Sequence, residues 1–94
     1  MRDKNFALAL LLEAIAANVR RIRLQRGFTQ EMLAERAGQD LSYVQRVERG
    51  ATNLSIAVLV SLASALDVAP SLLLRKARRI ATRRGRPPKR PTKT

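Results

Sequence analysis

Between residues 41 and 49 the chain carries polar, basic and apolar side chains whose spacing predicts two different faces of one helix. Val44 and Val47 recur on one side, as a helix that packs on a core requires. An arginine on the other side could bind guanine O6 and N7, a serine could bond to several bases, and a leucine could contact a thymine methyl. This second side is polar, basic and typical of a helix that reads a DNA major groove: Leu41, Ser42, Gln45, Arg46 and Arg49.

Catalytic and metal-binding chemistry has little support in the composition. The chain has no cysteine and no histidine, which excludes thiolate nucleophiles, histidine bases and the usual zinc sites. Its seven acidic residues are scattered at helix-surface spacing, and none stands with a second acid or base in an apolar setting that would make it reactive. We therefore expect a protein that is not an enzyme and that needs no cofactor or metal ion.

Two short helices joined by a tight turn are expected to position the polar face. The first spans residues 30–37, the turn is Gly38-Gln39-Asp40, and the second spans about 41–49. Leu33 and Ala37 are apolar anchors, and Ala34 is small enough for two helices to cross closely. Gly38 suits the left-handed backbone of a helix end, and Asp40 is expected to cap the second helix. This spacing predicts a helix-turn-helix.

Three further helices complete an all-α, five-helix fold. The spacing predicts helices over about residues 5–26, 56–66 and 71–82, with Ser55 capping the second of these and Pro70 preceding the third. The apolar run at residues 6–12 also resembles the core of a signal peptide. Glu13 interrupts that run, and the apolar phase continues through Ile15, Val19 and Ile22, which favours an amphipathic helix and no membrane anchor.

Residues 19–74 carry a set of motifs that resembles the lambda-repressor-like (XRE/Cro) helix-turn-helix family of bacterial and phage DNA-binding proteins. The motif segments are Arg23 with residues 27–30, residues 33–34, Gly38, residues 42–44, residues 47–50 and residues 53–55. Residues 21–24 and 53–56 are similar to a pattern of small restriction–modification controller proteins in that family. Gln39 and Asp40 depart from the family pattern, which usually has an apolar turn residue and a serine cap at these positions.

The resemblance implies roles for individual residues. Base-edge contacts are implied for Leu41, Ser42, Gln45 and Arg46, and phosphate contacts for Gln30, Tyr43, Arg49 and Asn53. It also implies an ion pair between Arg23 and Glu48. The negative charge of Asp40 would oppose binding to a DNA backbone unless the helix N-terminus occupies its carboxylate.

The basic charge is concentrated in the last twenty residues. Residues 75–94 hold ten of the 19 lysines and arginines and no acidic residue, so they form a basic tail after a domain of residues 1–74. We expect this tail to be disordered from about residue 84. Arg84-Gly85-Arg86-Pro87 resembles an AT-hook, which reads the minor groove of A·T-rich DNA. The alternatives are a basic segment that contacts DNA phosphates without reading bases, and a segment that contacts RNA or a protein.

These features together predict a sequence-specific transcriptional regulator that binds a palindromic operator as a homodimer in the cytoplasm, associated with the nucleoid. RNA polymerase or another protein is a further candidate partner. Two apolar surfaces could form the dimer: residues Leu54, Val58, Leu72 and Leu73, and residues Phe6, Leu8, Leu10 and Leu11. An architectural DNA-binding protein of weak specificity and an antitoxin-type interaction module that also binds DNA are the alternatives.

Overall fold

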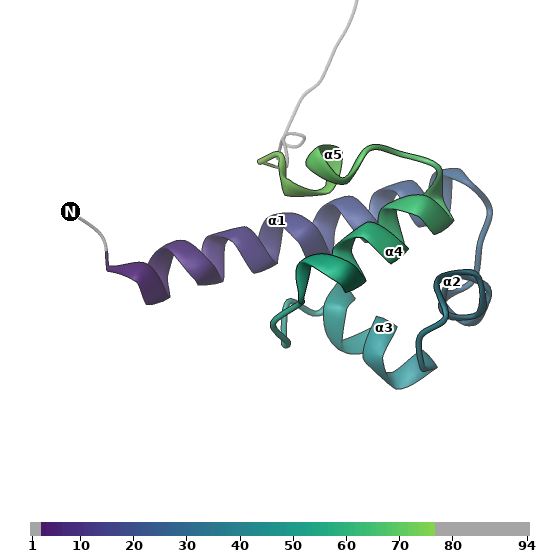
Figure 1. Cartoon of the computed structure of the whole chain (residues 1–94), viewed down its shortest axis with the longest axis horizontal. Helices are drawn as coiled ribbons and strands as arrows, with labels where there is room; N and C mark the ends of the chain where they lie inside the picture. Colours follow the sequence, from purple (N-terminus) through teal and green to yellow (C-terminus); the bar gives the residue numbers. More distant parts are fainter. Residues whose placement is uncertain (1–2, 77–94) are drawn as a thin grey trace, which may run out of the picture.

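The computed structural model describes residues 3–76, and within them the chain folds as five helices with no strand. The helices are α1 (Lys4–Gln25), α2 (Gln30–Ala37), α3 (Leu41–Glu48), α4 (Ile56–Leu66) and α5 (Pro70–Leu74). The all-helical, five-helix prediction is confirmed. The long α1 runs through the molecule, and the four shorter helices gather around its C-terminal part, so its first turns extend beyond the rest (Figure 1).

The helix ends follow from local chemistry. Thr29 Oγ1 accepts a hydrogen bond from the Met32 amide at 3.0 Å, and Ser55 Oγ accepts one from the Val58 amide at 3.0 Å. Each bond satisfies an amide that the first turn of a helix leaves without a partner. Gly38 ends α2 in the left-handed conformation with a φ of 70°, which glycine adopts without a steric penalty.

Asp40 stands at the N-cap of α3, but the expected side-chain cap is absent. The helix begins instead through the Asp40 backbone carbonyl, which accepts hydrogen bonds from the amides of Tyr43 and Val44, each at 3.1 Å. The Asp40 residue is exposed, so water can solvate its carboxylate without help from the helix N-terminus. Within the described residues the carboxylate makes no hydrogen bond or ion pair, so only the helix dipole at the start of α3 offsets its negative charge.

A single apolar core joins all five helices. Val19 and Ile22 of α1 lie in it with Leu33 of α2 and Val44 of α3. The remaining fully buried apolar side chains include Leu62 and Leu66 of α4 and Leu73 of α5. Leu73 is 0% exposed, so its predicted place on a dimer surface is wrong. Leu72, Leu73 and Leu74 are consecutive leucines, so the sequence did not show which of the three side chains points into the core.

The fifth helix is shorter than predicted. It ends at Leu74, and Arg75 is already extended with a ψ of 143°, so the prediction of a helix through residues 75 and 76 is wrong; residues 77–82 lie outside the described part. The physical reason is a buried amide in α1. Asn18 is 2% exposed, and its Nδ2 donates hydrogen bonds to the backbone oxygens of Leu73 at 2.9 Å and Arg75 at 2.7 Å.

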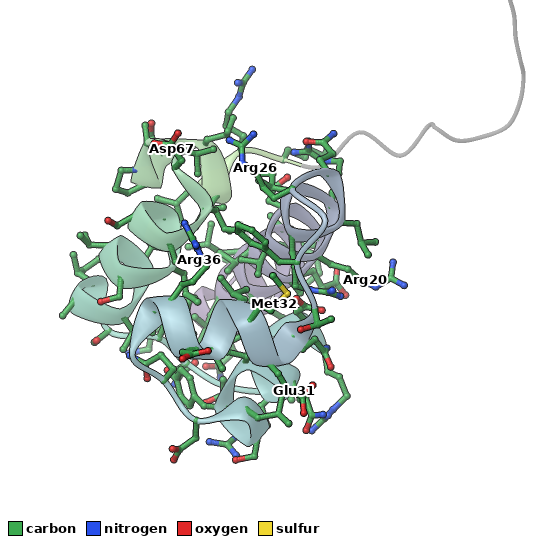
Figure 2. All side chains as sticks on the ribbon, turned by 90° about the vertical axis from the view of Figure 1, so that its right-hand side faces the viewer. Arg20, Arg26, Glu31, Met32, Arg36 and Asp67 are labelled. Carbon is green, nitrogen blue, oxygen red and sulfur yellow. The ribbon has the colours of Figure 1, made fainter. Side chains whose placement is uncertain are left out.

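Two arginines, Arg26 at the C-cap of α1 and Arg36 in α2, hold the C-terminal end of α4, which has no basic residue in its own last turn. Arg26 Nε donates to the Leu66 carbonyl at 2.8 Å, and Arg36 Nε donates to the Ala65 carbonyl at 3.3 Å. Both side chains lie on the same side of the molecule as Asp67 (Figure 2). Cations at this end complement the negative end of the helix dipole, so these bonds help to fix α2 against α4.

Candidate nucleic-acid interface

The α2–turn–α3 unit presents α3 as the exposed helix. Val44 and Val47 are buried with 0% and 2% exposure, and they pack with the apolar face of α2 in the core. The opposite side of α3 contains the residues predicted to contact bases: Ser42 and Arg46 are exposed, and Leu41 and Gln45 are partly exposed. The structure therefore separates the two faces of α3 as the spacing predicted.

A buried ion pair fixes the C-terminal end of α3 to α1. Arg23 Nε lies 2.6 Å from Glu48 Oε2, and an Arg23 terminal nitrogen lies 3.0 Å from Oε1, so the contact is bidentate. The two side chains are 9% and 4% exposed. Arg23 also donates to the backbone oxygen of Phe28 at 2.8 Å. The structure thus brings together the two residues for which the family resemblance implied an ion pair.

Gln30 joins the same network, which the sequence did not indicate. Its Nε2 donates to Glu48 Oε1 at 3.0 Å, so Glu48 binds the first residue of α2 as well as Arg23 of α1. A glutamine Nε2 carries two hydrogens, and one remains for another acceptor such as a phosphate oxygen. The contact fixes the start of α2 relative to the end of α3, and with it the position of the Gln30 amide.

Tyr43 connects α3 to the loop before α4. Its hydroxyl donates to the backbone oxygen of Asn53 at 3.3 Å, and the guanidinium of Arg46 lies 5.3 Å from the centroid of its ring. The second contact is a cation–π interaction between neighbours three residues apart on the helix. The spacing of the two residues was the signal that could have predicted it. Tyr43 therefore orients the guanidinium that is expected to reach a base.

The remaining predicted phosphate contacts lie at the edges of this surface. Arg49 is exposed and ends α3, and Asn53 is exposed in the loop between α3 and α4. The tail residues Arg84, Gly85, Arg86 and Pro87 lie outside the described residues. Within the described part, no group of three acidic, histidine or cysteine side chains could hold a metal ion, and no helix is long and apolar enough to cross a membrane.

The arrangement of α2 and α3 agrees with a family model. A model described as helix-turn-helix matches residues 19–73, which is more than half of the chain. The chain belongs to this helix-turn-helix family. The prediction of an XRE-like domain from the class of DNA-binding transcription regulators is therefore confirmed.

The chain is also similar to individual proteins and solved structures. The control protein C.SmaI of Serratia marcescens is 36% identical over 77 residues, which cover 81% of this chain and 92% of that protein. A hypothetical transcription factor of Neisseria meningitidis is 39% identical, and the match covers 68% of this chain and 60% of the relative. The crystal structure of the restriction–modification controller C.AhdI from Aeromonas hydrophila superposes with a TM-score of 0.64 at 42% identity, covering 66% of this chain and 94% of that one.

Proposed function

We propose that the protein is a sequence-specific transcriptional regulator, similar to restriction–modification controllers, that inserts α3 into the major groove of an operator. One observation carries the proposal. The inner face of α3 is buried and its end is held by Glu48, while its outer face exposes side chains that can bond to base edges. A rigidly held helix with an exposed polar face is the geometry that reading a base sequence requires.

Arg46 is the residue most directly suited to sequence discrimination. Arg46 is exposed and its guanidinium lies over the ring of Tyr43, so it is already held at the helix surface in the absence of DNA. A bidentate contact from such a group to guanine distinguishes it from other bases by about 1–3 kcal/mol. Ser42, Gln45 and Leu41 would contact neighbouring bases.

Phosphate contacts would set the register of the helix in the groove. Gln30 is held by Glu48 at the N-terminal end of α2, where the positive end of the helix dipole also favours an anion. Tyr43, Arg49 and Asn53 would contact the backbone on the α3 side. The exposed carboxylate of Asp40 opposes these contacts, because no hydrogen bond or ion pair within the described residues engages it.

A homodimer on a palindromic operator is part of the proposal, because one small domain contacts too few base pairs to be selective in a genome. Exposed apolar side chains on α4 and at the end of α5 offer a surface for it: Ile56 and Val60 are 74% and 46% exposed, and Leu74 is 37% exposed. An open cleft beside them is lined by Val60, Ser64, Asp67, Val68, Ala69 and Pro70. Of the residues predicted for this surface, Leu54, Val58 and Leu72 are partly exposed.

Selection of bound sites from random duplex DNA tests the proposal. The wild-type chain should enrich a two-fold symmetric sequence, and Arg46→Ala should lose preference at one position in each half-site. Lys4→Ala is the matched control, since Lys4 is also an exposed basic residue but lies in the first turn of α1, which extends beyond the rest of the bundle (Figure 1). Its selected sites should equal those of the wild type. Failure of the wild-type chain to enrich any sequence would contradict the proposal.

The concentration of charge in residues 75–94 favours a second candidate, an architectural DNA-binding protein that depends mainly on its tail. Such a protein would bind the selected site and a random duplex with equal affinity at every salt concentration. The regulator should instead retain a preference for its site as salt weakens binding to both. Contacts of the tail with the minor groove, and of the protein with RNA polymerase, remain predictions.

A further inference from the structure

The solvent side of α1 has a composition that the proposed function does not use. Five exposed residues recur there at spacings of three and four, which is the pattern of a helix that packs against another helix. These residues form what we call the outer face: Leu10, Glu13, Ala17, Arg20 and Leu24. Figure 2 shows that Arg20 projects away from the body of the molecule, so the bundle itself does not cover this side.

Two of these residues are large and apolar. Leu10 is 52% exposed and Leu24 is 53% exposed, whereas Val19 and Ile22 on the inner side of the same helix are 0% and 2% exposed. The family model begins at residue 19, so the first part of the outer face precedes the matched domain. The outer face therefore carries apolar area that the helix-turn-helix core does not require.

Ala17 lies at the centre of the outer face, with a negative charge on one side of it and a positive charge on the other. Glu13 lies four residues before it and Arg20 three residues after it, while Leu10 and Leu24 lie seven residues to either side. Among the described residues, neither the Glu13 nor the Arg20 side chain makes a hydrogen bond or an ion pair. Positions seven apart are not neighbours on one helix, so these two charges are not expected to pair within a single α1.

From this placement we infer that the outer face binds the outer face of a second copy, with the two α1 helices antiparallel and crossing at Ala17. In that arrangement Glu13 of each copy faces the Arg20 end of the other, and Leu10 faces Leu24. The small Ala17 side chains allow the two helices to approach closely at the centre. A parallel arrangement would instead place like charges opposite each other, which is unfavourable.

The contact is separate from the dimer surface proposed on α4 and α5, and it does not depend on DNA binding. It consists of few side chains, so it should be weak and should form at high protein concentration or where two dimers are held close together. The contact would join copies of the regulator. The charges of Glu13 and Arg20 would make the two α1 helices pack antiparallel.

Cysteine cross-linking tests the inference directly, because the chain has no cysteine of its own. The full chain with Ala17→Cys should form a disulfide-linked dimer at least ten times faster than the chain with Ala9→Cys. Both alanines are exposed on α1, but two copies of residue 9 would be about 24 Å apart in the antiparallel crossing. A disulfide needs α-carbons within about 7 Å. Equal cross-linking rates for the two variants would overturn the inference.

Charge reversal provides a second readout. In the Ala17→Cys background, Glu13→Arg should slow cross-linking at least fivefold because it places two cations opposite each other. Addition of Arg20→Glu should restore the rate, because the opposite charges then face each other with their positions exchanged. Both positions are exposed, so circular dichroism should show unchanged helix content. A double variant that cross-links as slowly as Glu13→Arg alone would also overturn the inference.

Discussion

The two halves of α1 contain similar apolar residues in different surroundings. In the second half, Ile15, Val19 and Ile22 are at most 5% exposed, because α3, α4 and α5 pack around them. In the first half, Leu8 and Leu10 are 41% and 52% exposed, because the helix extends beyond the bundle (Figure 1). Apolar side chains therefore contribute to folding in the second half of α1 and are available for contacts in the first half.

The two halves of α1 also differ in how their polar side chains are buried and hydrogen-bonded. Arg23 and Asn18 in the second half are buried and fully engaged, the first by Glu48 and the backbone of Phe28, the second by the end of α5. At the start of the first half, the exposed Asp3 side chain caps the helix by accepting a hydrogen bond from the amide of Phe6 at 2.8 Å. The second half thus fixes the other helices, and substitutions there should affect stability far more than substitutions in the first half.

Glu48→Ala should give the largest loss. It leaves the buried guanidinium of Arg23 without its carboxylate partner, and loss of one member of a buried pair costs about 3–5 kcal/mol. Urea unfolding followed by circular dichroism would measure the change in the free energy of unfolding. Glu31→Ala, an exposed acid on α2, is the control and should change it by less than about 0.5 kcal/mol. A loss for Glu48→Ala below about 1 kcal/mol would show that Arg23 is not held as the structure indicates.

Asn18→Ala should have an intermediate effect. It removes two hydrogen bonds to backbone oxygens at the end of α5, one of them buried, and an unsatisfied buried polar group costs about 1–3 kcal/mol. The loss should be local, so hydrogen exchange at the amides of Leu73 and Leu74 should accelerate more than exchange at Leu33 of α2. Uniform acceleration across all these amides would indicate that Asn18 does not act through α5.

Sequence patterns predicted the helices that end at local signals. Glycine at residue 38, threonine at residue 29 and serine at residue 55 mark helix ends within a few residues, so α2, α3 and α4 could be placed from spacing alone. The end of α5 could not be placed, because the amide that holds it belongs to Asn18, which is 55 residues away from Leu73 in sequence. Long-range hydrogen bonds of this kind leave no local pattern.

The candidate site shows the same limit. The exposed face of α3 follows from the spacing of Val44 and Val47, which are buried as helical periodicity requires. The bond from Gln30 to Glu48 depends on how α2 and α3 cross, so residue spacing alone could not predict it. The cap predicted for Asp40 is absent because the backbone carbonyl starts the helix without the side chain, a choice that residue type does not determine.

Leu10→Ala should have the smallest effect on stability and so provides the sharpest contrast with the second half. Leu10 is about half exposed, and alanine is the best helix former, so the free energy of unfolding of the dilute protein should change by less than about 0.5 kcal/mol. Ile15→Ala, five residues further along α1 but 5% exposed, should cost about 2–5 kcal/mol. Equal losses in dilute solution would mean that the first half of α1 is covered within a single copy. If copies join through α1, the thermal stability of the wild type should rise more steeply with protein concentration than that of Leu10→Ala, since association stabilises the folded state.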